Sequence, residues 1–318
     1  MKAIVLSAIG GPEVLTLRDL PTPAPGANQV LVRVKAAAVN PIDYKLRKTG
    51  ALGIKPGDIL GFDAAGVVEA VGPGVSHLKR GDEVFYSPGF GLPGAYAEYN
   101  VADASIVALK PARLSFIEAA ALPLAGMTAY DGIVIRGNIR LGHNVLISAA
   151  NGGVGSIAVQ LANAAGAYVF ATCSTRNVDF VKSLGADRVL NYQTENWSDI
   201  IAKECPAPPA GLDLVYDCVG GDVVSRSIPL MKQSYDGGGQ IVSIVNPASQ
   251  LAEGYRRNIT VHYQFLHRRR ETLQALATLV DRGQLRPLID STLPLEQAAE
   301  AHCKLESGGV KGKIVLTM

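Results

Sequence analysis

The chain has little charge, few cysteines and no long apolar run. Charged residues make up 18% of its 318 residues, below the roughly 25% of an average soluble domain. Because 30 basic residues nearly balance 28 acidic ones, the net charge is only +2, which gives no general attraction to nucleic acid or anionic membrane. No apolar run reaches the roughly 18 residues of a membrane span, and the short apolar start predicts a first strand rather than a signal peptide.

The cysteines exclude two further classes. There are four, Cys173, Cys205, Cys218 and Cys303, and no two of them form a C-x-x-C pair. A disulfide framework or a local zinc knuckle is therefore not expected. The few, scattered cysteines instead suggest a reducing, cytoplasmic compartment. In contrast, hydrophobic residues reach 48%, enough for a packed core.

The pattern of apolar residues changes along the chain. Residues 1–110 hold short β-branched runs broken by Gly and Pro, such as 30–34, 66–72 and 81–85, which predict an antiparallel, barrel-like β domain. Residues 116–132 look helical, with an interruption at Pro123.

Strands and helices then alternate. Strands are predicted at 145–149, 168–173, 187–192, 212–217 and 240–245, and helices at 154–165 and 178–184. Such alternation predicts an α/β fold with a doubly wound parallel sheet covered on both faces. A strand at 259–265, helices at 270–282 and 295–306, and a last strand at 313–317 follow, and we expect this end of the chain to return to the first domain.

A glycine-rich loop joins the first strand of this series to a helix. Gly153-Val154-Gly155-Ser156-Ile157-Ala158 fits the pattern G-x-G-x-x-[G/A]. Small residues let the backbone approach a pyrophosphate, and the helix N-terminus adds partial positive charge. We therefore expect Asn151, Gly152, Gly153 and Val154 to bind a dinucleotide. The alternative is a plain turn in an α/β domain without a cofactor.

The next strand end indicates which dinucleotide. An NAD site places an acidic residue about 20 residues after the glycines, whereas residues 171–177 contain no carboxylate. Ser174 and Arg176 can instead bind a 2′-phosphate, so we infer NADPH. In the alternative, Ser174 caps the following helix and Arg176 is a solvated surface residue.

The segments at 39–45, 60–68, 81–84, 122–129, 173–192 and 311–315, together with the glycine loop, carry a family resemblance. Across nearly the whole chain the sequence resembles the zinc-independent quinone oxidoreductase and enone (2-alkenal) reductase group of the medium-chain dehydrogenase/reductase family. The resemblance implies a GroES-like catalytic domain at 1–124, a Rossmann NADPH-binding domain at 125–262, and a C-terminal segment at 263–318 that returns to the catalytic domain.

The resemblance also implies a mechanism without metal. Zinc dehydrogenases of this superfamily carry Cys and His ligands where this chain has Asn40 and Phe62, so no metal site is expected. The implied reaction passes hydride from NADPH to a small quinone or α,β-unsaturated carbonyl. A homodimer is implied as well, with no nucleic-acid or membrane partner.

Three residues are the candidates for catalysis. Lys45 can donate to the enolate or bind its oxygen, Tyr44 can donate a proton, and Asn40 can hold the substrate oxygen or the ribose. Each has an alternative: Asn40 starts a turn before Pro41, Tyr44 packs in the core, and Lys45 is solvated. Asp43 is expected to cap the helix that begins there.

Further cofactor contacts follow from the resemblance alone. They are Thr128 and Phe265 near the nicotinamide, Tyr192 beside the 2′-phosphate, Cys218 and Val219 over the ribose, and Ser243 and Ile244 after a later strand.

Other readings stay open. The chain can instead be an enoyl-thioester reductase, or a NADPH-binding protein without turnover. The loop 87–94 is expected beside the substrate. The dense basic run at 267–270 is either a nucleic-acid patch or the solvated start of a helix.

Overall fold

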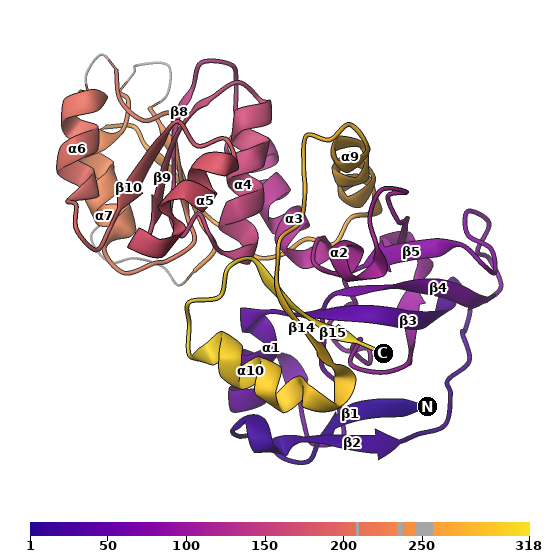
Figure 1. Ribbon diagram of the computed structural model, residues 1–318. Helices are drawn as coiled ribbons and strands as arrows, with labels where there is room; N and C mark the ends of the chain where they lie inside the picture. The colour runs from indigo at the N-terminus through magenta and orange to yellow at the C-terminus, as the bar shows by residue number, and fades with distance from the viewer. Residues whose placement is uncertain (208–209, 234–237, 246–256) are drawn as a thin grey trace. The chain divides into compact units, whose positions relative to one another are not determined.

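The chain folds into two compact units (Figure 1). The computed structural model describes residues 1–318 except 208–209, 234–237 and 246–256. The first unit consists of Met1–Met127 and Arg268–Met318, and the second unit of Thr128–His267. Among the described residues, no helix is both long and apolar enough to cross a membrane.

The second unit is built on a parallel sheet. Its described strands have the order β10-β9-β8-β11-β12-β13, and every neighbouring pair is parallel. The strands are β8 (Asn144–Ile147), β9 (Tyr168–Cys173), β10 (Arg188–Asn191), β11 (Leu214–Asp217), β12 (Gln240–Ser243) and β13 (Thr260–Tyr263). The central strands β8 and β11 are mostly apolar and buried, as expected for a sheet covered on both faces.

Helices cover this sheet from both sides. They are α4 (Gly153–Ala164), α5 (Val178–Ser183), α6 (Trp197–Glu204) and α7 (Val223–Ser227). In Figure 1, α6 and α7 lie on one side of the strands and α4 lies on the other. Trp197 and Ile201 of α6 pack into a buried cluster with Leu146 and Phe170 of the sheet. The predicted doubly wound arrangement is therefore confirmed.

The first unit is mainly antiparallel. Its larger sheet has the order β14-β15-β3-β4-β5-β7, with β6 also paired to β3, and β1 pairs with β2. The strands are β1 (Lys2–Leu6), β2 (Leu15–Asp19), β3 (Gln29–Val39), β4 (Ala64–Val71), β5 (Glu83–Tyr86), β6 (Tyr99–Asp103), β7 (Ala108–Leu109), β14 (Ile289–Pro294) and β15 (Lys313–Thr317). This is the expected GroES-like β unit, and only the pair β14–β15 among its described pairs is parallel.

The helices of the first unit follow local sequence signals. They are α1 (Pro41–Thr49), α2 (Phe116–Ala120), α9 (Arg270–Asp281) and α10 (Ala298–Glu306), while α3 (Pro123–Tyr130) crosses the division between the units. Ser115 and Glu118 cap α2 reciprocally. Pro123 begins α3, which confirms the predicted interruption.

The last strand joins distant parts of the first unit. Strand β15 pairs antiparallel with β3, so that Ile314 lies opposite Val39. The next residues beyond these two, Lys313 and Asn40, are thereby brought together. This register places a residue near the C-terminus at the start of α1.

Candidate active site

The glycine loop has the geometry of a dinucleotide cradle. Gly152 precedes α4, and its N–H donates to the carbonyl oxygen of Ala149 at 2.9 Å. A Cβ atom at Gly155 would lie 2.3 Å from that same oxygen, so only glycine allows the helix to approach the strand this closely. The first amides of α4 have no partner within the helix and are free to face an anion. The loop therefore fits a pyrophosphate.

The ends of β9 and β10 place Ser174 and Tyr192, two of the predicted phosphate-binding residues, side by side. Asn191 pairs with Cys173, and the N–H of Tyr192 donates to the Cys173 carbonyl at 3.2 Å, so Tyr192 and Ser174 are neighbours. Arg176 and Tyr192 are exposed. The hydroxyl of Ser174 accepts from the Asn177 side chain at 2.9 Å and makes no helix cap.

A residue that sequence reasoning missed fixes this loop. The side-chain oxygen of Gln193 accepts hydrogen bonds from the N–H and the hydroxyl of Thr175, both at 3.1 Å. Asn191 adds a bond of 2.8 Å to the same hydroxyl. The turn that carries Ser174 and Arg176 is thus held from the neighbouring strand.

Asp217, also missed, organises the loop after β11. It is fully buried, and its Oδ1 accepts from the N–H groups of Val219 and Gly220 at 2.9 Å. Its Oδ2 accepts from the Ser243 hydroxyl at 2.9 Å. The Ser148 hydroxyl links this carboxylate to the N–H of Cys218. Polar residues at the ends of buried parallel strands were the signal for this cluster.

Thr128 and Phe265, the residues predicted near the nicotinamide, both lie in the second unit. The Thr128 carbonyl accepts from the Tyr216 hydroxyl at 2.9 Å and from the Gln264 amide at 2.8 Å. Phe265 follows Gln264 and is 58% exposed. The N–H of Ile244 donates to the Asp217 carbonyl at 3.1 Å. Gln264 is a further residue that the sequence did not single out.

Asn40 lies in a buried charged cluster of the first unit. Its amide donates to Asp63 Oδ2 at 2.8 Å, and its side-chain oxygen accepts from the ammonium of Lys313. Lys313 also pairs with Asp63 at 3.0 Å, and the N–H of Leu124 donates to Asp63 Oδ1 at 2.6 Å. Burial raises the pKa of Asp63, and the Lys313 ammonium acts against that rise. Both the nitrogen and the oxygen of the Asn40 side-chain amide are therefore hydrogen-bonded inside the protein.

A second buried chain of polar groups begins at Asp43. Its Oδ2 accepts from the Asn40 N–H at 2.6 Å, which confirms the expected cap, and from the Tyr96 hydroxyl at 2.9 Å. Burial raises the pKa of Asp43 to about 7. The Tyr96 oxygen lies 3.2 Å from His302 Nε2, and Arg47 lies 3.2 Å from the other ring nitrogen. Burial and the Arg47 charge lower the pKa of His302 to about 3.

Tyr44 and Lys45 differ from Asn40 in their exposure. Tyr44 is half-buried, with the Lys48 ammonium 5.5 Å from its ring centre, and Lys45 is exposed. Their side chains remain accessible on α1, whereas Asn40 is only 2% exposed. The three predicted catalytic residues are thus close in sequence but different in environment.

Two aromatic rings and an arginine form a separate group in the first unit. The ring centres of Phe62 and Phe90 are 4.9 Å apart. The Arg268 guanidinium lies 4.2 Å from the Phe90 ring centre and 5.9 Å from that of Phe62. Within the basic run 267–270, Arg268 is therefore directed at aromatic side chains rather than at solvent.

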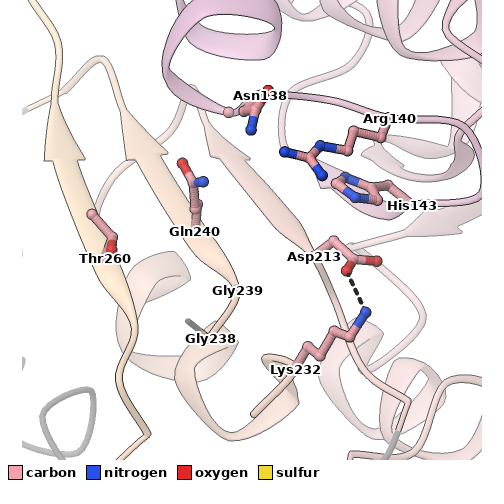
Figure 2. A pocket seen from close by; sticks show the side chains of 10 residues that line it. Asn138, Arg140, His143, Asp213, Lys232, Gly238, Gly239, Gln240 and Thr260 are labelled. Atoms are coloured by element: carbon pink, nitrogen blue, oxygen red, sulfur yellow. Dashed lines mark hydrogen bonds and ion pairs between the residues drawn. The ribbon is translucent and has the colours of Figure 1, made fainter. Parts of the chain in front are cut away.

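A polar pocket of about 390 Å³ lies where strands β11, β12 and β13 begin (Figure 2). Lys232 and Asp213 form an ion pair of 3.1 Å at its wall, drawn as a dashed line. The glycine loop follows the end of β8, so the pocket lies at the other end of the strands. None of the predicted cofactor residues lines it. The described residues also contain no group of three or more His, Cys, Asp or Glu side chains arranged to hold a metal ion.

The combination of a GroES-like β unit and a Rossmann-type unit with a glycine loop defines a class of nicotinamide-dependent oxidoreductases. Residues 26–112 match the family model "Alcohol dehydrogenase GroES-like domain", and residues 184–316 match "Zinc-binding dehydrogenase".

Relatives and solved structures similar to this chain over nearly its whole length are also oxidoreductases by name. The chain is 34% identical to the chloroplast envelope quinone oxidoreductase homolog of Arabidopsis thaliana, covering 96% of this chain and 95% of that one. It is 34% identical to the chloroplastic NADPH-dependent alkenal/one oxidoreductase of the same plant, covering 99% and 79%. The quinone oxidoreductase structure from Coxiella burnetii covers 100% of this chain and 99% of that chain, with 36% identity and a TM-score of 0.89.

The chain belongs to the medium-chain dehydrogenase/reductase family, in the group of quinone and alkenal/one oxidoreductases, as its sequence predicted. It is therefore an oxidoreductase enzyme whose family binds a nicotinamide cofactor.

Proposed function

We propose that this enzyme reduces quinones or α,β-unsaturated carbonyl compounds with NADPH and without zinc. The observation that carries the zinc-independent reading is the cluster of Asn40, Asp63 and Lys313. The Lys313 ammonium is bound to the Asn40 side chain, at the position where the zinc dehydrogenases carry a Cys ligand. A buried ammonium repels a divalent cation at such short range, and Phe62, in place of a His ligand, offers no lone pair.

The residues of the second unit fit NADPH. The glycine loop suits the pyrophosphate, and the turn bearing Ser174 and Arg176, with Tyr192 beside it, suits a 2′-phosphate. When bound, the reduced nicotinamide supplies the hydride for the reaction. The carbonyl group of the acceptor makes a Lewis acid unnecessary, because its conjugation already renders it electrophilic.

Tyr44 and Lys45 are the proposed sources of the proton that the reduced acceptor needs. Both side chains are accessible on α1, and each carries an O–H or N–H that can be donated. Because the Asn40 amide is engaged at both ends, we assign Asn40 the task of holding Lys313 and Asp63 rather than the acceptor.

The test is a matrix of acceptors and cofactors. The purified protein is given NADPH or NADH with 1,4-benzoquinone, 9,10-phenanthrenequinone, an enone or an enoyl thioester, and loss of the reduced cofactor is followed by absorbance. Faster oxidation of NADPH by quinones or the enone is expected. Preference for the thioester would instead identify an enoyl-thioester reductase, and tight NADPH binding without oxidation would identify a binding protein.

A further inference from the structure

The side chain of Arg268 lies among aromatic rings and has no role in the proposed function as described so far. Its guanidinium stacks over Phe90 and faces Phe62, and Phe62 is only 2% exposed. Its Nε and Nη2 atoms are buried and find no hydrogen-bond partner in the described part of the chain. Burial lowers the pKa of Arg268 to about 10, which still leaves it charged near neutral pH.

Buried donors of a charged group are costly when they are unpaired. Most buried polar atoms in proteins have a partner, and an unpaired one calls for an explanation such as a ligand or a catalytic task. The carboxylate whose charge acts on Arg268 is that of Asp63, which already accepts hydrogen bonds from Asn40, Lys313 and the Leu124 N–H. Both Arg268 donors therefore remain available to a molecule that brings its own oxygen.

The aromatic neighbours define what that molecule must look like. Phe62 and Phe90 offer apolar ring surfaces that favour a flat, conjugated body. The guanidinium presents a planar fork of donors that suits an oxygen bearing negative charge. A conjugated carbonyl compound has both parts, an apolar plane and an oxygen at its edge.

We propose that Arg268 binds the carbonyl oxygen of the acceptor through Nε and Nη2 while Phe62 and Phe90 hold the conjugated body. During reduction of an enone, bound NADPH would supply a hydride with its two electrons, and a C–H bond would form at the β-carbon. The C=C π pair then shifts, and negative charge develops on the oxygen until a proton quenches it. Arg268 stabilises that charge. This assignment rests on the proposed function and adds one catalytic residue to it.

Two variants and a matched control test the proposal. Arg268→Met removes the charge and the donors at similar size, and Arg268→Lys keeps the charge but loses the fork. Arg269→Met is the control, because Arg269 is the exposed next residue of the same basic run. We expect Arg268→Met to lower kcat/KM for the enone about 100-fold, in the range seen when one oxyanion donor is removed, and Arg268→Lys to fall in between. Arg269→Met should stay within about twofold of the wild type.

A binding measurement tests the role of Arg268 without any need for turnover. The planar aromatic oxyanion 4-nitrophenolate is titrated into each protein at alkaline pH by equilibrium dialysis, and NADPH binding and Tm are recorded for each variant. Loss of nitrophenolate binding in Arg268→Met, with NADPH binding and Tm retained, supports Arg268 even if no acceptor is reduced. Equal nitrophenolate binding and equal kcat/KM in wild type and Arg268→Met would overturn it. If the wild type reduces no acceptor, the proposed function fails separately.

Discussion

The ammonium of Lys313 donates a hydrogen bond to the side-chain oxygen of Asn40, which lies 273 residues earlier in the chain. The antiparallel register of β15 and β3 creates this contact, because it sets Ile314 opposite Val39. Asp63 closes the cluster by pairing with both side chains. A buried positive charge and its counterion thus lie beside Asn40 in the first unit.

Removing Lys313 should destabilise the first unit. In Lys313→Met, the fully buried Asp63 loses its counterion, and breaking a buried pair in this way costs about 3 kcal/mol of unfolding free energy. Urea unfolding measures the loss. The double variant Lys313→Met, Asp63→Asn should recover part of it, since no unpaired charge remains. A loss below about 1 kcal/mol in the single variant would show that the pair contributes little.

Asp43 should make stability depend on pH. Its pKa rises from 3.8 in the unfolded chain to about 7 in the folded protein. Its contribution to the free energy of unfolding is therefore complete below pH 3.8 and is lost as the pH rises through about 7. His302, whose pKa falls to about 3, acts oppositely, because its contribution is lost as pH falls below 6.5.

Comparing the pH dependence of stability in wild type and Asp43→Asn isolates the effect of Asp43, because His302 is present in both proteins. The stability advantage of the wild type over Asp43→Asn should shrink by about 2 kcal/mol between about pH 5 and about pH 7. Chemical unfolding across this range provides the measurement. Parallel pH profiles for the two proteins would show that the carboxyl group of Asp43 does not titrate there.

Arg176 should determine the choice of cofactor. Arg176→Ala is expected to raise KM for NADPH about 10-fold or more, the loss typical of a hydrogen bond to a charged group, while KM for NADH stays the same. Steady-state kinetics with both cofactors measures this change. Arg140→Ala serves as the control, because Arg140 is exposed in the same unit and lines the pocket at the other end of the strands. Equal changes for NADPH and NADH would contradict a phosphate-binding role.

Gly155 should not tolerate a side chain. In Gly155→Ala the new Cβ would meet the Ala149 oxygen at 2.3 Å, which must push α4 away from the strand and open the glycine loop. NADPH affinity is expected to fall at least about 10-fold, with a lower Tm. A Cβ at Gly89 meets no atom within 4 Å, so Gly89→Ala should leave Tm unchanged. Unaltered NADPH binding in Gly155→Ala would argue against the cradle.

Tyr44 and Lys45 should share the supply of the proton. The double variant Tyr44→Phe, Lys45→Ala is expected to lower kcat about 100-fold, as the loss of a positioned acid does, without a change in NADPH affinity. Each single variant should lose less, because the other donor remains. Wild-type turnover in the double variant would mean that the proton comes from solvent.

Elements with a strong local signal could be predicted from the sequence. The predicted strands at 168–173 and 313–317 coincide with β9 and β15, and the break at Pro123 separates α2 from α3. Strand β14 was missed because its side chains are only partly buried and it ends in a proline, so its pairing with β15 is what makes it a strand. Helix α6 was missed because only Trp197 and Ile201 are buried in it.

The site was predictable only where its parts are near in sequence. The glycine loop and the Ser174 turn each lie within one strand-to-helix connection, so their composition alone indicates a nucleotide. The partners of Asn40, in contrast, come from β15 and from Asp63, the residue just before β4, and His302 of α10 lies beside Tyr96. Such contacts depend on strand register and helix docking, which no local pattern encodes.

The most direct test of the central claim is turnover after removal of metal. The protein is dialysed against a strong zinc chelator, its metal content is measured, and NADPH oxidation by a quinone or enone is compared before and after. The account predicts the same kcat/KM in metal-free protein and no gain when zinc is added back. Loss of activity on chelation, with recovery on adding zinc, would contradict it.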